Sequence, residues 1–261
     1  MTGAPSRLPG PAFFEREGER VVPGAHAASR WGAMLNGRTL AGLVAWATER
    51  DHADVAYQPA RLTVDMFRAV PVEPMLVTTT SVRDGHRVKV IDVSLQQGEL
   101  EVSRGSVVLL RRGDPPPGEV FSAPLWDAPD PDRLPTLEGG PPWETRPVGG
   151  DGRSFGRAAW VRERAPFVAG EAHSPFLRAA LASDVTNLLA NSGDRGLGFI
   201  NADLTLYLAR SPVGEWIGCE ATDHADADGV AFGSSSLYDR GGRIGHVALC
   251  AVADPRLVTP G

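Results

Sequence analysis

Apolar residues follow two different periods along the first half of the chain. Between Gly37 and Arg50, apolar residues such as Leu40, Leu43 and Ala47 recur every three or four positions, which predicts a helix with one buried face. After this helix, apolar and polar positions alternate, as in residues 88–95, which is typical of a half-buried strand. Four strands are predicted, over residues 60–67, 75–82, 88–95 and 99–110, with turn sequences at residues 83–85 and 96–98.

The second half shows the same order of patterns. Ser174-Pro175 is a favourable helix start, and the helical pattern continues to Asn191. Strands are predicted over residues 198–209, 215–221, 231–238 and 243–252, and residues 239–242 form the last hairpin turn. One helix packed on an antiparallel sheet, twice over, is an α+β architecture.

Matching residues indicate that the two halves are copies. The sequence LTVDMFR at residues 62–68 aligns with LTLYLAR at residues 204–210, an offset of 142. Gly85 and Gly98 are 13 residues apart, as are Gly229 and Gly242, at an offset of 144. Matches in the same order at nearly one offset predict an internal duplication.

A proline-rich stretch separates the copies between Arg112 and Phe155. Proline disfavours helices and central strands, so this stretch is expected to be irregular or extended. Its apolar side chains need cover, and each tryptophan alone buries roughly 150–250 Å² when packed. We therefore expect an ordered strap against the folded body, and three segments: residues 1–112, the connection 113–154, and residues 155–261. The apolar residues of the strap are Phe121, Leu125, Trp126, Leu134 and Trp143.

The composition narrows the classes of function. The chain has 261 residues, 42% of them hydrophobic, and a net charge of −6, which is ordinary for a globular protein and argues against a nucleic-acid binder. Two cysteines and six histidines form no ligand pair, so no metal is expected. No stretch approaches the ~20 apolar residues that span a bilayer, and a cytoplasmic location is expected.

One charged residue interrupts the apolar face of the second predicted helix. Leu177, Leu181 and Leu188 lie on one face, and Asp184 falls between the last two. A carboxylate there is costly unless it is paired or hydrated. One interpretation is that Asp184 caps a shorter helix that starts at this point. The other is that it faces a cavity, as a base or a group that holds water. By the offset of 142, its counterpart in the first half is Gly42.

Motifs around both helices carry a family resemblance. In the second half, Ala182-Ser183-Asp184 precedes Asn201-Ala202-Asp203-Leu204-Thr205-Leu206-Tyr207, and Arg210 and Glu215-Trp216 follow. In the first half, Gly37-Arg38-Thr39 precedes Phe67-Arg68 and Arg83-Asp84-Gly85. Their order and spacing resemble the acyl-CoA thioesterase II family over residues 13–255, apart from the strap. The resemblance implies a double hotdog fold, in which each sheet wraps a central helix and the acyl-thioester site lies between the copies. It also implies an acyl-CoA substrate, no cofactor, and a homo-oligomer, a dimer of double hotdogs.

The resemblance also implies site residues. In the family, an Asp on the second helix, a Thr at the next strand and a Gln on the last strand hold the attacking water. Asp184 matches the Asp, Asn201 stands at the Thr position, and Leu249 or Cys250 stands at the Gln position. Asp184 would then activate water, and Asn201 would fix the water or donate to the thioester oxygen. The N–H groups near Gly37 are the expected oxyanion site, because a helix N-terminus favours negative charge.

Several alternatives stay open. Asn201 is equally well explained as a turn residue before a strand, and Gly37 as a helix-entry glycine. Since the family's Gln is missing, a non-catalytic protein that binds acyl thioesters is the second candidate, beside the hydrolase. A hotdog dehydratase is disfavoured, because no histidine stands near Asp184 in the sequence. Cys250, between Leu249 and Ala251, is expected to pack in the core rather than act as a nucleophile.

Overall fold

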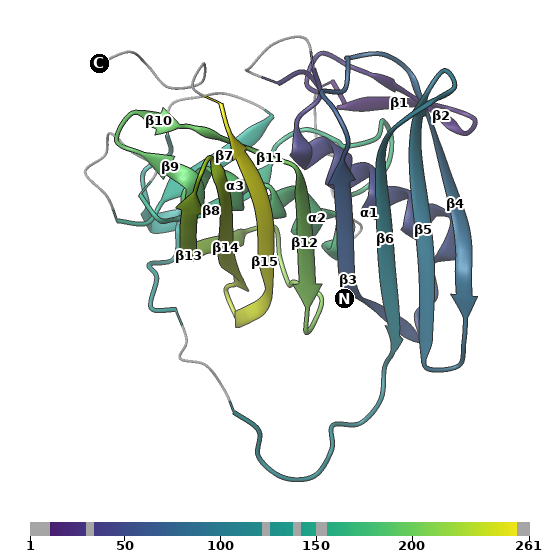
Figure 1. Cartoon of the computed structure of the whole chain (residues 1–261). Helices are drawn as coiled ribbons and strands as arrows, with labels where there is room; N and C mark the ends of the chain where they lie inside the picture. The colour runs from purple at the N-terminus through teal and green to yellow at the C-terminus, as the bar shows by residue number, and fades with distance from the viewer. Residues whose placement is uncertain (1–10, 30–33, 122–125, 138–141, 150–155, 255–261) are drawn as a thin grey trace.

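Two similar halves share one large antiparallel sheet in the computed structural model, which describes residues 11–29, 34–121, 126–137, 142–149 and 156–254 (Figure 1). In the first half, β1 (Phe14–Glu17) and β2 (Arg20–Pro23) precede α1 (Gly37–His52), and four strands follow: β3 (Tyr57–Met66), β4 (Met75–Asp84), β5 (Val88–Gln97) and β6 (Leu100–Arg111). This half contains the predicted helix and all four predicted strands.

The second half repeats this order. After the short helix η1 (Pro131–Arg133), β7 (Trp143–Pro147) and β8 (Ala158–Glu163) precede α2 (Pro175–Ser183) and α3 (Val185–Asn191). The remaining strands are β9 (Ser192–Gly193), β10 (Gly196–Leu197), β11 (Phe199–Asn201), β12 (Asp203–Leu208), β13 (Ile217–Ala227), β14 (Val230–Asp239) and β15 (Gly242–Ala253). The structure confirms the predicted α+β class. The hairpins β1–β2 and β7–β8, which extend the sheet beyond β4 and β13, were not predicted.

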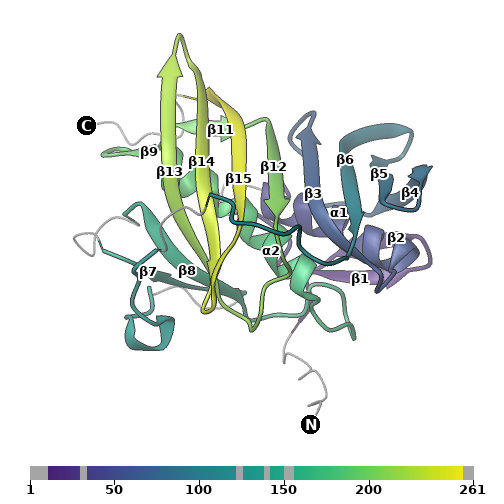
Figure 2. The ribbon, with the colours of Figure 1, turned by 90° about the horizontal axis from the view of Figure 1, so that it is seen from below.

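The duplicated strands β3 and β12 lie side by side at the centre of the sheet. They pair antiparallel, with Thr63 opposite Thr205 and Leu62 opposite Leu206. Residues 63 and 205 are themselves 142 apart, so the pairing is symmetric about this point. The strand order is β4-β5-β6-β3 on one side and β12-β15-β14-β13 on the other, and the helices lie on one side of the sheet (Figure 2).

Side-chain caps start both helices where the sequence predicted. The N–H of Thr39 donates to Asn36 Oδ1 at 2.9 Å, and the N–H of Leu177 donates to Ser174 Oγ at 2.9 Å. The second helix is not continuous, however, because it breaks at Asp184 between α2 and α3. Asp184 makes no side-chain cap bond to α3, so its carboxylate is free to point elsewhere.

The helices are offset by 138 residues and the strands by 142. The expected equivalence of Gly42 and Asp184 is therefore wrong, because α1 starts at residue 37 and α2 at residue 175. A longer connection before β11 accounts for most of the difference. Gly42 instead lies at the helix crossing, where an added Cβ would be 2.6 Å from Leu181 Cδ2 and from Phe167 Cζ.

Parts of the proline-rich stretch pack against both halves. Trp126 stacks near Trp160 and Tyr238, with ring centroids 5.3 and 5.0 Å away, and Trp143 lies 4.8 Å from Phe13. Phe121 differs from the expectation, since it is 91% exposed. Leu125 and Phe155 fall outside the described residues.

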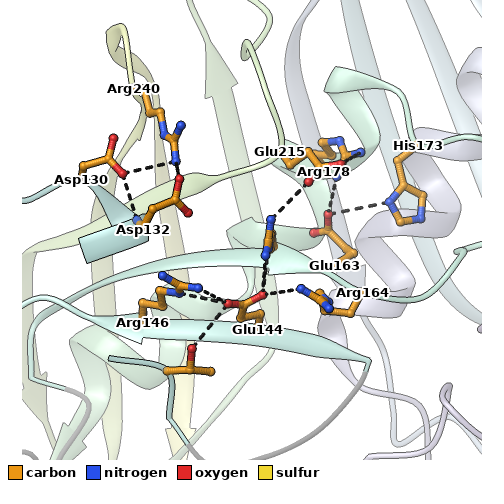
Figure 3. A network of polar contacts seen from close by, with 12 residues as sticks. Asp130, Asp132, Glu144, Arg146, Glu163, Arg164, His173, Arg178, Glu215 and Arg240 are labelled. Atoms are coloured by element: carbon orange, nitrogen blue, oxygen red, sulfur yellow. Dashed lines mark hydrogen bonds and ion pairs between the residues drawn. The ribbon is translucent and has the colours of Figure 1, made fainter. Parts of the chain in front are cut away.

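Ion pairs hold β7 within the sheet (Figure 3). Glu144 of β7 accepts hydrogen bonds from Arg146 at 2.6 Å and from Arg162 and Arg164 at 2.9 Å. Burial alone would raise the pKa of Glu144, but the hydrogen bonds from Arg146 and Arg162 bring it down to about 2. Glu144 is therefore ionised near neutral pH. Among the described residues, no helix is long and apolar enough to cross a membrane.

Candidate functional site

The three residues singled out from the sequence come together where the two halves meet. Gly37 begins α1 of the first half, Asp184 lies between α2 and α3, and Asn201 ends β11. The Asn201 amide donates to Asp184 Oδ1 at 2.9 Å, and this oxygen also contacts Gly37. The site therefore draws one residue from the first half and two from the second.

A glycine at position 37 is needed for this approach. An added Cβ would collide with the Asp184 carboxylate and would lie 2.8 Å from Met66 Cε. The N–H groups of α1 are also accounted for in part: that of Thr39 is capped by Asn36, and that of Arg38 donates to Asp184. For the Gly37 N–H, the described part of the chain offers no acceptor.

Asn201 is held by more than its bond to Asp184. Its Oδ1 accepts from Asn187 Nδ2 at 3.4 Å, and its Nδ2 also lies 3.8 Å from Met66 Sδ. Ala202, the next residue, donates its N–H to the carbonyl of Cys250, which ties this end of β11 to β15. The Asn201 side chain is thus oriented on both sides, unlike that of a solvated turn residue.

Two opposing effects act on the acidity of Asp184. Burial raises its pKa, whereas the Arg38 guanidinium, the Asn201 amide and the Arg38 N–H favour the charged form and limit the rise. Arg38 itself stacks on the Trp143 ring, with its guanidinium carbon 4.0 Å from the centroid. Burial lowers the pKa of Arg38, and Asp184 and Glu163 oppose this. Arg38 is therefore the positive charge that faces the candidate site.

A second set of buried charges lies around Glu163 (Figure 3). Glu163 Oε2 is 3.3 Å from Arg178 Nη1 and 3.8 Å from His173 Nδ1. Burial raises the pKa of Glu163 to about 7, against the effect of Arg178. Burial also lowers the pKa of His173 to about 4, and Arg178 adds to this. His173 is neutral, since its Nε2 accepts the Phe167 N–H at 2.8 Å.

The two positions considered for the family's Gln face opposite sides of β15. Leu249 is only 3% exposed and points inward, whereas Cys250 is exposed on the outer face. The expectation that Cys250 packs in the core is therefore wrong, because strand alternation turns it away from the helices. Only position 249 faces the interior. The carboxamide next to Asn201 is that of Asn187, which comes from α3.

Arg38, Met66 and Asn187 were not identified as site residues from the sequence. Arg38 lies directly beside Gly37, so the glycine itself pointed to it. Asn187 follows Asp184 by three residues and therefore shares its helix face, a spacing that the sequence does contain. Nothing in the sequence pattern singles out Met66, whose position depends on the contact between the two halves.

The fold is that of double hotdog proteins. An acyl-CoA thioesterase II from Mycobacterium marinum is 20% identical, with a TM-score of 0.66 over 84% of this chain and 90% of the other. A TesB protein from Mycobacterium avium subspecies paratuberculosis is 18% identical, with a TM-score of 0.67 over 93% and 96%. A protein of unknown function with a hot dog fold from Alicyclobacillus acidocaldarius is 15% identical, with a TM-score of 0.72 over 95% and 96%.

Matches to two family models identify the family to which the chain belongs. The model of the acyl-CoA thioesterase N-terminal domain matches residues 27–110, and that of the C-terminal domain matches residues 115–251. The chain belongs to the acyl-CoA thioesterase family, which confirms the resemblance seen in the sequence. No curated protein matches it by sequence.

Proposed function

We propose that the protein hydrolyses an acyl-CoA thioester to the free acid and CoA with a water molecule activated by Asp184. The observation that carries this proposal is the convergence of Asp184, Asn201 and the N-terminus of α1. Thioester hydrolysis needs an acceptor that orients and deprotonates water, and donors for the developing oxyanion. These groups come from different elements and both halves.

Asp184 is suited to the role of base. A carboxylate with a raised pKa is a stronger base than an exposed one, provided that it stays ionised at the working pH. Burial supplies the rise, and the nearby Arg38 guanidinium favours the ionised form. The attack forms a bond between the water oxygen and the thioester carbon, and one water proton passes to Asp184. The C–S bond then breaks, and the leaving CoA sulfur takes this proton from Asp184, so that the free acid and the CoA thiol are released and the carboxylate is restored.

Asn201 and Gly37 have supporting roles in this proposal. The Asn201 carboxamide, which donates to Asp184, fixes the water or the thioester oxygen beside the carboxylate. The Gly37 N–H lies at the positive end of α1 and next to Asp184, which suits an oxyanion donor. The acyl chain length is left open.

The alternative is a protein that binds acyl-CoA without hydrolysing it. One observation favours it: the inward-facing position on β15 is Leu249, whose side chain cannot hold water as the family's Gln does. The two functions differ in turnover and not in binding.

A thiol-release assay with acyl-CoAs of increasing chain length tests the proposal. We expect release by the wild type and a large loss in Asp184→Asn, which keeps the shape but not the base. Binding of acyl-CoA by calorimetry without any thiol release would favour the binding protein. If the protein neither binds any acyl-CoA of the panel nor releases thiol from it, both functions are contradicted.

Other expectations remain proposals. We propose that the chain divides into residues 1–112, 113–154 and 155–261, with β7 as the part of the middle segment that pairs with β8. We also propose that the protein is cytoplasmic and acts in fatty acid metabolism.

We further propose that the protein forms a homo-oligomer, a dimer of double hotdogs. The outer face of the sheet exposes Val230, Phe232 and Val252, which supports a contact between copies. Sedimentation of the purified protein tests the oligomer.

A further inference from the structure

All four asparagines of the chain lie at or beside the candidate site. Asn36 caps α1, Asn201 donates to Asp184, and Asn187 and Asn191 follow Asp184 along α3. Asn187 and Asn191 are buried, at 6% and 3% exposure. A buried carboxamide destabilises the fold unless both its oxygen and its NH₂ group find partners. The hydrogen-bond partners of Asn187 and Asn191 therefore indicate the role of these two side chains.

Three of the asparagines, Asn191, Asn187 and Asn201, form one continuous chain of hydrogen bonds. His224 Nδ1 lies 2.7 Å from Asn191 Oδ1, at the outer end of the chain. Asn191 Nδ2 then donates to Asn187 Oδ1 at 2.9 Å, and Asn187 Nδ2 donates to Asn201 Oδ1 at 3.4 Å. The last donor, Asn201 Nδ2, reaches Asp184. The chain thus connects a half-exposed histidine on β13 to the proposed base.

A backbone carbonyl determines the direction of this chain. Asn187 Nδ2 also donates to the Phe199 carbonyl at 3.1 Å, and a carbonyl can only accept. Asn187 Oδ1 must therefore face Asn191, which presents its NH₂ group. Asn191 Oδ1 then faces His224 and accepts a hydrogen bond from the Nδ1–H group. At the other end, the Asp184 carboxylate accepts from Asn201. Both ends require the same orientation of every amide.

We propose that Asn187 and Asn191 are positioning residues, which act on Asp184 only through the Asn201 carboxamide. The inference rests on the proposed function and deepens its site. Each amide in the chain accepts one bond and donates the next, so the chain fixes the rotation of Asn201 and strengthens its donation to Asp184. Gly233 on β14 leaves the space for Asn191, because an added Cβ would be 2.7 Å from Asn191 Oδ1.

A double-mutant cycle on thiol release tests this dependence. Asn187→Ala should lower kcat about 3- to 10-fold with little change in KM, the loss that corresponds to one net hydrogen bond of about 1 kcal/mol. In an Asn201→Ala background, the same substitution should leave kcat unchanged, because the residue through which it acts is gone. Equal losses in the two backgrounds would overturn the proposal, since a merely structural residue has additive effects.

Two further variants separate positioning from stability. Thr186→Val is the matched control, because Thr186 is a buried neighbour on α3 whose hydroxyl has no partner among the described residues, and it should leave kcat unchanged. Gly233→Ala displaces the Asn191 side chain without altering any asparagine, and it also shifts the end of α3, because the added Cβ would lie 2.7 Å from Ala190 Cβ. If Asn187→Ala does not fold, the loss in Gly233→Ala and its disappearance in the Asn201→Ala background decide the question in the same way.

An NMR measurement tests the chain without any turnover. Protein made with ¹⁵N-asparagine has only four labelled side-chain amides, one from each asparagine. In Asn187→Ala, the signals of Asn191 and Asn201 should shift and that of Asn36 should stay. An unmoved Asn201 signal would overturn the proposal. If the wild type released no thiol from any acyl-CoA, the proposed function would fail, and these spectra would still decide whether the chain orients Asn201.

Discussion

Gly37→Ala adds one methyl group at the contact between the two halves. Its Cβ would collide with the Asp184 carboxylate and would lie 2.8 Å from Met66 Cε, whereas carbon atoms in good contact are about 3.5–4.0 Å apart. The Met66 side chain is flexible and can move away. The carboxylate cannot retreat without stretching its 2.9 Å hydrogen bond with Asn201.

The size of the effect follows from this displacement. The carboxylate has to move by roughly 1 Å, and a misplacement of that size lowers a reaction rate by about 100-fold. Stability should change little, because alanine in place of glycine favours a helix by up to about 1 kcal/mol and offsets part of the strain. We therefore expect a large loss of kcat in a protein that is about as stable as the wild type.

Gly42→Ala on the same helix is the matched control. Its Cβ would be 2.6 Å from Leu181 Cδ2 and Phe167 Cζ at the helix crossing, and overpacking of this kind lowers stability by about 1–3 kcal/mol. Thiol release and urea unfolding of both variants should give opposite results: lost turnover for Gly37→Ala, lost stability for Gly42→Ala. Wild-type turnover in Gly37→Ala would refute the assigned contact between α1 and Asp184.

Three other predictions follow from buried charges and from the proline-rich stretch. Arg38→Met should raise the pKa of Asp184, so that the acid limb of kcat/KM moves to higher pH while Arg38→Lys keeps it near the wild-type position; a limb unmoved in Arg38→Met would contradict this. Glu163, with its pKa raised to about 7, makes the folded state less stable as pH rises from about 4.5 to 7, and His173, with its pKa lowered to about 4, makes it more stable from about pH 4 to 6.5. In the wild type these two opposite contributions to the free energy of unfolding cancel where they overlap. Glu163→Gln removes the first, so chemical denaturation of this variant should show stability that rises with pH, and a flat profile would count against the assignment. Trypsin should cleave after the exposed Arg112 well before Arg133, which lies in η1 directly before the packed Leu134; early cleavage at both sites, seen by mass spectrometry, would show that the strap is not held.

Local patterns were enough to predict most of the fold. The helix at Gly37, the cap at Ser174 and the meander strands follow from periodicity and turn residues, which depend on near neighbours in the sequence. The break between α2 and α3 at Asp184 was harder to predict from the sequence, because Asp184 keeps helical backbone angles and the interruption depends on what its carboxylate contacts. The hairpins β1–β2 and β7–β8 are short edge elements with little alternation, and pairing with β4 and β13 stabilises them more than their own residues do.

The candidate site could be predicted only in part for the same reason. Asp184 stands out as a carboxylate on an apolar face, and Gly37 as the start of a helix. Their contact, however, joins residues 147 positions apart and exists only because the copies pack together. Met66 and Arg38 owe their roles to that packing. Cys250 was misplaced because the sequence does not say which face of β15 points inward at that position.

The most direct test of the account is thiol release from acyl-CoA by the wild type and by Asp184→Asn under the same conditions. The substitution keeps the side-chain shape and a hydrogen bond to Asn201 but removes the base. The account predicts a loss of roughly 10²–10⁴-fold in kcat, as expected for a general base. Equal rates in the two proteins would contradict it and remove Asp184 from the mechanism.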